Sequence, residues 1–327
     1  MNENKKMNEV PGLVSCMTSI TETLKADRKR SAMRTYPVTM HSYERFARQT
    51  GRSMAVTEVF TPGRLKEYEE YLRGLQRSWN TVSTYMRTLQ AVYNRIVPPG
   101  TPGYIPALFK EVYTRVEPLT KRSLTEKQMD AVVNTKVTIP SSTLQQAQGY
   151  FSLMFMLQGM PFIDLAYMQK KDLKGNYLIY CRHKTGKRMK VRIPKEAAEL
   201  LRVYRNRDNR SIYLLPILKG GLKDDWAVYH CYQRALRDFN RSLLRLASML
   251  LPAVKLSSYT PRHTWATLAY HQGTPVGAIS KALGHSSIRV TENYLRPFED
   301  EQLERVNAKV IKGVMKNWKG CPVHKGR

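Results

Sequence analysis

Apolar residues recur every three or four positions along the first third of the chain, which is the spacing of a helix face. One such stripe covers 13–27, and a second ends just before Gly51, a residue type that suits the left-handed position after a helix. Pro37 lies inside the second stripe, so the helix there is predicted either to start at the proline or to kink at it.

Two further helices are predicted before residue 97. Thr61 and Pro62 have the pattern of an N-cap and a first helical residue, and Asn80 is predicted to cap the longest helix of this region. Residues 13–97 are therefore predicted to form a small domain of about four helices. A flexible tail is expected at 1–12.

A cluster of prolines and glycines ends this pattern and predicts a linker over 98–122. Ser123 and Glu126 then form a capping-box signature, which predicts the first helix of a second domain. That domain is expected to extend over 123–310, and a basic tail is expected over 311–327.

The second domain is predicted to be helical around one small sheet. Apolar spacing predicts a helix over 144–158, and helices resume after Pro194. Between them, 177–182 and 188–193 have the pattern of two short strands joined by a turn that contains Gly186. The predicted fold class is therefore mainly α with a small antiparallel β-sheet, in two domains.

Charge changes this picture from a generic helical protein to one that binds a polyanion. The 327 residues include 54 Lys and Arg but 26 Asp and Glu, which gives a formal net charge of +28 and a pI near 10.0. The excess is spread through amphipathic sequence, as expected of a folded nucleic-acid-binding protein. Hydrophobic residues make up 42% of the chain, enough for a sizeable core, which excludes wholesale disorder.

Other classes of protein find no support in the sequence. No apolar run reaches the roughly 18 residues that a membrane-spanning helix needs, and no apolar segment of a secretory signal is evident. We therefore expect a cytoplasmic protein without a membrane partner. The four cysteines lie far apart, which predicts free thiols and no metal site. Cys321 and His324 form a lone C-x-x-H pair, which supplies too few ligands for structural zinc.

The predicted hairpin has the densest charge. Nine Lys and Arg but a single acid, Asp172, lie between residues 170 and 192. One interpretation is a solvated basic face. The other is a ribbon laid against DNA, where lysine and arginine neutralise phosphates and release counterions. The overall charge favours the second interpretation.

The segment 259–298 places chemistry-bearing residues at predicted helix ends. One helix begins with Arg262, whose guanidinium would lie at the positive helix end, where an anionic phosphate is favoured. A second helix is predicted to end at Gly284. His285 then begins a turn, and Tyr294 is expected on a third helix.

This segment resembles the tyrosine recombinase (phage integrase) family. The matching motifs are R-H-T-W-A-T from Arg262, L-G-H-S-S around His285 and T-x-x-Y-L around Tyr294, and the strong likeness covers residues 150–298. W-N-T-V-S-T-Y-M-R-T-L-Q-A-V-Y-N at 79–94 is similar, with less specific motifs, to the family's SAM-like core-binding domain. The whole chain resembles most the branch of mobile-element integrases and DNA invertases.

The resemblance implies a phosphoryl-transfer site. Tyr294 would attack a scissile phosphodiester to form a 3′-phosphotyrosine, and a 5′-hydroxyl would leave. Arg262 would hold a phosphate oxygen, His285 would bind the same phosphate or assist proton transfer, and Lys184 would protonate the leaving oxygen. Tyr259, three residues before Arg262 where the family has a histidine, is included in the site. Fixed donors stabilise such a transition state without a metal, so no cofactor is expected.

The resemblance also implies a DNA-binding surface and an assembly. Basic residues of the hairpin and of the first domain are expected to contact DNA: Arg182, Lys187, Arg188, Arg77 and Arg87. The partner would be double-stranded DNA, bound by a homotetramer on paired recombination sites, and an accessory DNA-bending protein is left open. An apolar stripe near the C-terminus packs either on a neighbouring protomer or on its own domain: Leu303, Val306, Val310 and Val314.

One arginine of the family pattern is missing. Where the family has G-[LM]-R-x-x-[DE]-L, the chain reads G-M-P-F-I-D-L from Gly159, so Pro161 stands at the arginine position. Either a nearby cation replaces the arginine, with Arg182, Lys187 and Arg188 as candidates, or catalysis is weakened or depends on a partner.

Three functions stay open. The leading one is a site-specific recombinase that integrates or excises a mobile element or inverts a DNA segment. A non-catalytic DNA-binding or architectural protein would be consistent with Pro161, and a type IB topoisomerase would share the chemistry. Single residues also have structural interpretations: Tyr294 as a packing residue, Arg262 as an ion-pair partner of Asp164, and His263, for which packing is favoured.

Overall fold

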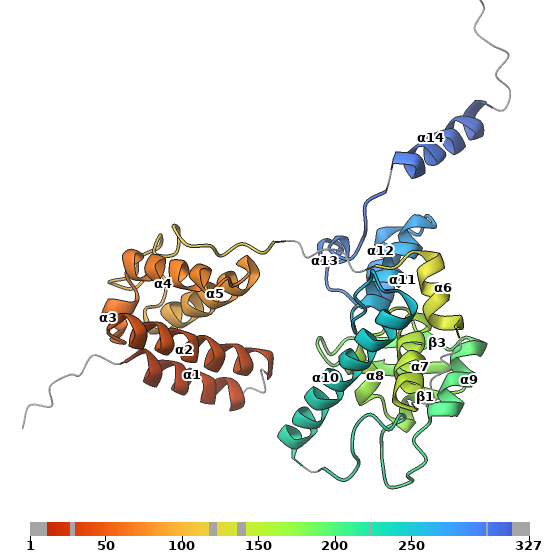
Figure 1. The fold of residues 1–327 in the computed structure, drawn as a ribbon, viewed down its shortest axis with the longest axis horizontal. Coiled ribbons are helices and arrows are strands. Elements are labelled where there is room, and N and C mark those ends of the chain that lie inside the picture. The colour runs from red at the N-terminus through yellow and green to blue at the C-terminus, as the bar shows by residue number, and fades with distance from the viewer. Residues whose placement is uncertain are drawn as a thin grey trace, which may run out of the picture. The chain divides into compact units, whose positions relative to one another are not determined.

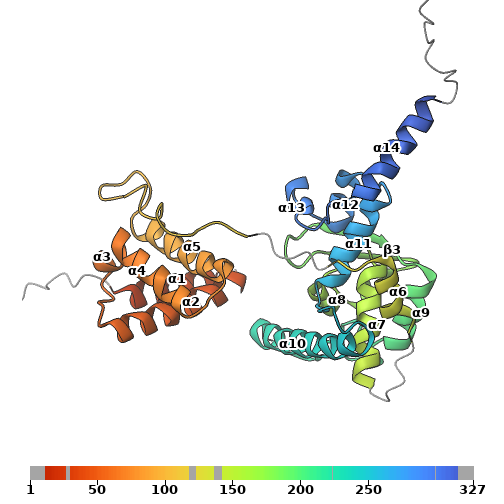
Figure 2. The ribbon, with the colours of Figure 1, turned by 45° about the horizontal axis from the view of Figure 1, so that its top comes forward.

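The computed structural model describes residues 12–26, 30–117, 123–135, 142–222, 224–298 and 300–315. The chain divides into two compact units, Met1–Leu119 and Thr120–Arg327. Figure 1 shows their elements, and Figure 2 shows the same ribbon turned by 45°. Each unit has a hydrophobic core of its own, so each is described by itself. Within the described residues, no helix is long and apolar enough to cross a bilayer.

The first unit is a set of helices around an aromatic centre. Its helices are α1 (Leu13–Ala26), α2 (Arg30–Thr50), α3 (Val56–Val59), α4 (Pro62–Gly74) and α5 (Trp79–Ile96), and α1 lies beside α2 in both views (Figure 1, Figure 2). Tyr43 and Phe46 of α2 meet Tyr68 of α4, with ring centroids 4.8 and 5.3 Å from that of Tyr68. All three rings are buried, so their apolar area holds α2 against α4.

Two helix ends of this unit follow the predicted capping chemistry. Thr61 caps α4, and its Oγ1 accepts a hydrogen bond from the amide of Arg64 at 3.3 Å. Gly51 follows α2 with a φ of 66°, as predicted. The predicted start at Pro37 was wrong, because α2 begins at Arg30 and contains the proline. Packing of α2 on α1 stabilises the helix across the backbone bond that a proline removes.

The helix α5 starts before Asn80, its predicted cap. Ser78 is the N-cap, with its Oγ accepting from the Thr81 amide at 3.3 Å. The Asn80 side chain bonds elsewhere: its Oδ1 accepts from the Glu117 amide at 2.9 Å, and its Nδ2 donates to the Glu117 carbonyl at 3.1 Å. This pair of bonds fastens the segment after α5 to the helices.

The first unit extends beyond residue 97, into the expected linker at 98–122. Leu108, Phe109 and Val112 are buried in its core. The prolines and glycines of this stretch do predict an irregular backbone, and its described part, 98–117, contains no helix or strand. Burial of three large side chains nevertheless binds it to the helices, and the unit ends near residue 119.

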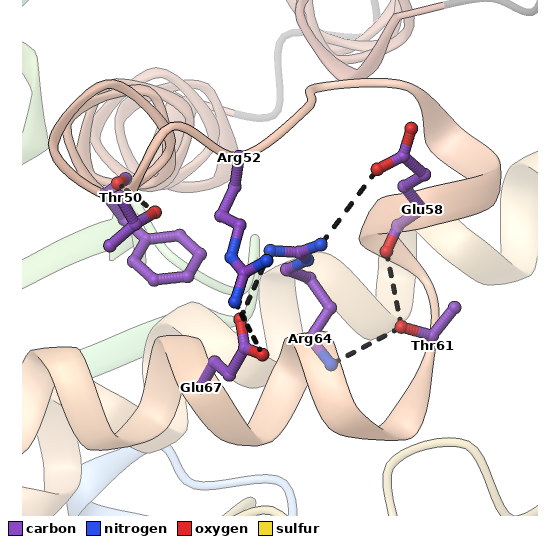
Figure 3. A network of polar contacts seen from close by, with 7 residues as sticks. Thr50, Arg52, Glu58, Thr61, Arg64 and Glu67 are labelled. Carbon is purple, nitrogen blue, oxygen red and sulfur yellow. Dashed lines mark hydrogen bonds and ion pairs between the residues drawn. The ribbon is translucent and has the colours of Figure 1, made fainter.

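A polar network crosses the junction of α3 and α4 (Figure 3). Arg64 NH1 donates to Glu67 Oε2 at 3.1 Å, and its NH2 lies 4.0 Å from Glu58 Oε2. Arg52, which follows α2, pairs with the other oxygen of Glu67 at 3.2 Å. The Thr61 hydroxyl donates to the Glu58 carbonyl at 3.3 Å. Thr61 therefore both caps α4 and links it to α3.

The second unit places one small sheet among helices, which confirms the predicted fold class. Its helices and strands, in chain order, are α6 (Glu126–Asn134), α7 (Ser142–Met156), α8 (Phe162–Tyr167), the 3-10 helix η1 (Lys170–Asp172), β1 (Leu173–Lys174), β2 (Tyr177–Cys181), β3 (Arg188–Arg192), α9 (Lys195–Tyr204), α10 (Asp225–Leu250), α11 (Thr260–His271), α12 (Val276–Leu283), α13 (Ile288–Glu292) and α14 (Asp300–Val314).

The predicted hairpin is present in the sheet, whose strand order is β1-β2-β3. β2 pairs antiparallel with β3 from Tyr177 opposite Arg192 to Cys181 opposite Arg188, and Gly186 turns the chain between them with a φ of 66°. The sequence did not predict β1, because two residues are too few to show an alternating pattern.

The core of the second unit is built on α7. This helix packs against α9, α10 and α11, and its Phe151, Leu153 and Met154 are fully buried. At the start of α8, Phe162 stacks on Phe239 of α10 with ring centroids 4.3 Å apart. Residues of α8 and α11 that are far apart in sequence are thereby held on one scaffold.

The first helix of this unit starts at a different capping box from the predicted one. Thr125 and Gln128 exchange the side-chain and backbone bonds of the box, in place of the box predicted from Ser123. The preceding residue is already fixed, because the Leu124 amide donates to the buried Thr264 Oγ1 of α11 at 3.0 Å. A tertiary contact thus sets the start of α6.

Most of the two predicted tails lies outside the described residues. Residues 1–11 and 316–327, with Cys321 and His324, lie outside the described residues. The helix α14 continues to Val314, so the predicted basic tail begins inside a helix.

Thr61→Ala should destabilise the first turn of α4 by about 1 kcal/mol, the usual effect of losing an N-cap side chain. The Arg64 amide loses its acceptor, so its hydrogen exchange should become about fivefold faster. Thr61→Ser keeps the oxygen and should retain the wild-type exchange rate. Equal exchange in wild type and Thr61→Ala would contradict the capping role.

Candidate active site

Arg262 enters the interior of the second unit from the first turn of α11. Its side chain is 3% exposed, and its NH1 donates to the Gly159 carbonyl at 2.9 Å while its NH2 donates to the Leu283 carbonyl at 2.6 Å. Gln158 and Gly159 have φ values of 60° and 65°. This left-handed turn brings the Gly159 carbonyl to the guanidinium.

The end of α12 places His285 beside this arginine. Gly284 has a φ of 67°, which confirms it as the residue that ends the helix. The Gly284 amide donates to the Lys281 carbonyl at 3.1 Å, and the His285 amide donates to the Ser280 carbonyl at 3.0 Å. These two bonds form a Schellman motif, which fixes the direction of the chain at His285.

The hydrogen bonds of His285 assign its tautomer. Its Nε2 lies 2.8 Å from Arg262 NH2, and an arginine can only donate, so Nε2 accepts and the proton is on Nδ1. Nδ1 lies 2.9 Å from Thr291 Oγ1, to which it donates. Burial, followed by the charges of Arg262, Arg182 and the hairpin lysines, lowers the pKa of His285 to about 3. The imidazole is therefore neutral at physiological pH.

Tyr294 lies in the turn after α13, not on that helix as predicted. The helix ends at Glu292. The Tyr294 ring lies against both neighbouring histidines, 4.5 Å from the His263 ring and 4.8 Å from the His285 ring. The carbon at the centre of the Arg262 guanidinium is 5.4 Å from the centroid of the same ring. The structure thus brings Arg262, His285 and Tyr294 together.

A second arginine, Arg182, lies in the same cluster. It directly follows β2 and is 7% exposed, and its Nε donates to Asp164 Oδ2 at 3.1 Å. Its NH1 donates to the carbonyls of Leu283 at 2.5 Å and of Gly284 at 3.3 Å. Asp164, considered above as a partner of Arg262, is therefore in direct ion pair with Arg182.

The other residues predicted for the site are arranged around this cluster. Lys184 is exposed in the hairpin turn, close enough for its charge to lower the pKa of His285. Lys187 Nζ donates to the His285 carbonyl at 3.4 Å. Arg188 is exposed on β3. Tyr259 is 56% exposed and has no hydrogen bond or ring contact, among the described residues, with the three residues of the cluster.

The two basic residues predicted in the first unit lie on its surface. Arg77 follows α4, Arg87 lies on α5, and both are exposed. Their contact with DNA stays a prediction.

Sequence reasoning missed two threonines that hold the cluster. The Thr291 hydroxyl accepts a hydrogen bond from His285 Nδ1. Thr291 is the threonine of T-x-x-Y, so the motif contained the signal. Thr267 donates to the Tyr294 carbonyl at 3.2 Å and accepts from the Arg296 amide at 3.3 Å. It fixes the backbone on which the tyrosine stands, a role that no motif indicates.

The arrangement provides positive donors, a neutral imidazole and a hydroxyl in one place. Burial, followed by the adjacent Arg182, lowers the pKa of Arg262, which reflects two guanidinium groups held close together. No group of three or more His, Cys, Asp or Glu side chains suited to a metal occurs in the described part of the chain. Chemically, such an arrangement can hold an anion, and a tyrosine hydroxyl lies at its edge.

Residues 122–301 match the family model described as the phage integrase family. The chain belongs to that family. The match covers α6 to α13 and includes all the residues of the cluster. No curated protein is detectably similar in sequence.

Solved structures of integrases and recombinases share the fold of this phage integrase family member. A lambda integrase dimer bound to a core site matches over 87% of this chain and 77% of its own, with a TM-score of 0.61 and 17% identity. XerH recombinase bound to its difH substrate matches over 94% of this chain and 90% of its own, with a TM-score of 0.58 and 15% identity. The Tn1549 transposon integrase with transposon right-end DNA matches over 92% of this chain and 99% of its own, with a TM-score of 0.56 and 13% identity.

The free energy of unfolding of the DNA-free protein should fall as pH is lowered from 6.5 to 5, partly because of His285. Unfolding restores the ordinary histidine pKa of 6.5, whereas the folded residue stays neutral down to about 3. The unfolded state therefore binds more protons in this window and becomes favoured. His285→Gln should flatten this pH dependence, as measured by urea unfolding at several pH values.

His230→Gln is the matched control, because it removes an exposed histidine of α10. It should keep the wild-type pH dependence. An unchanged slope in His285→Gln would contradict a neutral, half-buried imidazole at this position.

Proposed function

We propose that the chain is a tyrosine-type site-specific recombinase, which cleaves and rejoins DNA through a 3′-phosphotyrosine. The observation that carries the proposal is the cluster of Arg262, His285 and Tyr294, within hydrogen-bond and ring-contact distance of one another on the family's fold. A phosphodiester is the substrate that suits these groups, because a guanidinium offers paired donors to its oxygens.

The proposed reaction is a transesterification. The Tyr294 hydroxyl oxygen bonds to the scissile phosphorus as the bond from phosphorus to the 5′ oxygen breaks. Lys184 gives a proton to the leaving 5′ oxygen, and the proton of the tyrosine passes to solvent. His285 stays neutral: its Nε2 accepts from Arg262, and its Nδ1 donates to Thr291, so it holds the guanidinium in place. The reverse reaction by another 5′-hydroxyl rejoins the strand. The covalent intermediate conserves the energy of the bond, so no nucleotide is consumed.

Arg262 stabilises the transition state in this scheme. The guanidinium is fixed by two backbone carbonyls before DNA arrives, so little reorganisation is needed when charge develops on the phosphate. Double-stranded DNA is the proposed partner, and the formal net charge of +28 supports it.

The proposed assembly is a homotetramer on two recombination sites, since exchange between two duplexes needs four cleavages. An apolar face of α14 supports it, because Leu303, Val306 and Val310 are each at least half exposed. We propose that this face docks on a neighbouring protomer. Integration, excision and inversion differ in the arrangement of the two sites, and the same chemistry serves all three.

A non-catalytic DNA-binding protein is the second candidate, and Pro161 favours it. This residue supplies no cation at the position where the family pattern has an arginine. A topoisomerase would differ from both by relaxing plasmids that contain no specific site.

Covalent trapping tests the proposed function. Nicked duplexes from the DNA that flanks the gene should give a protein–DNA adduct with the wild type, because release of the short strand prevents rejoining. Tyr294→Phe should bind the same duplexes and give no adduct, as seen by denaturing electrophoresis. Tyr270→Phe, which alters a neighbouring tyrosine on α11, is the matched control and should still form the adduct.

Two outcomes would contradict the proposal. Binding by the wild type without any adduct would favour the non-catalytic candidate. An adduct that persists in Tyr294→Phe would assign the nucleophile to another residue.

A further inference from the structure

We propose that Arg182 is the second arginine of this active site and binds the scissile phosphate beside Arg262, in place of the arginine that Pro161 replaces. The inference rests on the proposed function, because it concerns the same phosphate.

Arg182 and Arg262 lie side by side at the end of α12. Arg182 and Arg262 come from β2–β3 and from α11, yet both donate to one atom, the carbonyl oxygen of Leu283, at 2.5 and 2.6 Å. Two guanidinium groups that share an acceptor lie side by side. Nε of Arg182 donates to Asp164, and its NH1 donates to the carbonyls of Leu283 and Gly284. Its NH2 has no hydrogen-bond partner among the described residues. A donor therefore remains for a ligand next to Arg262.

The buried cluster carries more positive than negative charge. Two arginines are 3% and 7% exposed, and in the described chain the pair with Asp164 is the single ion pair that either one makes. His285 is neutral and offsets none of this charge. A buried charge without a counter-ion is costly unless a ligand supplies one. An anion with two acceptor oxygens, such as a phosphodiester, completes this balance.

Glycines make room for both arginines. A Cβ on Gly284 would lie 2.7 Å from Arg182 Cδ, and a Cβ on Gly159 would lie 3.0 Å from Arg262 Cα. Both glycines also have positive φ values, 67° and 65°. Glycine at these two positions therefore allows the backbone to approach the two arginines closely.

Asp164 acts as the positioning residue for Arg182. It lies in the first turn of α8, which Pro161 precedes as the N-cap. One carboxylate oxygen accepts from Arg182 Nε, and the other accepts from the His183 amide at 2.9 Å. The helix that follows Pro161 thus holds, through its acid, an arginine from the hairpin.

The other two candidate cations are placed differently. Lys187 is exposed and contacts the His285 backbone at 3.4 Å, and Arg188 is exposed on β3. Neither is buried in the cluster. They are suited to phosphates along the DNA backbone, where solvent-exposed cations act.

The test compares two DNA substrates in the adduct assay, one with the normal scissile phosphate and one with a neutral methylphosphonate there. Arg182→Gln keeps a donor for Asp164 but loses the charge. It should form the adduct about 100-fold or more slowly on phosphate DNA. On methylphosphonate DNA, which needs less positive charge, it should come within about tenfold of the wild type. Arg188→Gln should have the same effect on both DNAs.

Equal losses by Arg182→Gln on both DNAs would overturn the proposal, since a structural defect does not depend on the charge of the phosphate. Adduct formation by Arg182→Gln at the wild-type rate on phosphate DNA would overturn it as well. Circular dichroism at the assay temperature checks that the variant is folded.

A binding measurement separates this inference from the proposed function. In a Tyr294→Phe background, where no chemistry occurs, adding Arg182→Gln should reduce the slope of log affinity against log salt by about 1, the effect of one lost phosphate contact. An unchanged slope would overturn the inference. Absence of a wild-type adduct alone, with the reduced slope present, would instead overturn the proposed function.

Discussion

The carbonyl oxygen of Leu283 is the acceptor on which the site depends. Leu283 is the last residue of α12. At this end of a helix, backbone carbonyls have no partner within the helix, and the helix dipole is negative. Both Arg182 and Arg262 donate to the Leu283 carbonyl. In the described chain, Asp164 is the one ion-pair partner of these two buried guanidinium groups. Without the carbonyl of Leu283, their repulsion in the protein interior would be less well offset. The helix end keeps this positive charge in place in the DNA-free protein.

The other parts of the site follow from the same helix end. Gly284 turns the chain out of α12 and leaves space for Arg182, and the next residue is His285, which accepts from Arg262. Thr291 then fixes the imidazole, and Tyr294 follows against its ring. A short stretch of chain thus determines the positions of the acceptor, the neutral histidine and the proposed nucleophile.

Sequence predicted the parts that depend on local chemistry. Thr61 and Gly284 mark helix ends by their own side-chain or backbone properties, and the motifs around Arg262, His285 and Tyr294 predicted that these residues meet. Tertiary contacts account for the misses. Asn80 bonds to Glu117 and so does not cap α5.

The role of Arg182 could be narrowed but not decided from sequence. Three cations of the hairpin were equivalent candidates, since charge and spacing do not distinguish a buried arginine from an exposed one. The distinction comes from a backbone carbonyl, which has no sequence signature, and from Asp164, which lies 18 residues earlier in the chain. Only the fold brings these groups together.

A crystal structure of the Tyr294→Phe variant bound to its DNA site tests the central claim most directly. The quantity to measure is the distance from each arginine to the non-bridging oxygens of the scissile phosphate. The account predicts that Arg182 and Arg262 both lie about 3 Å from oxygens of that one phosphate. A phosphate held by Arg262 alone, with Arg182 still bonded just to Asp164 and the end of α12, would contradict it.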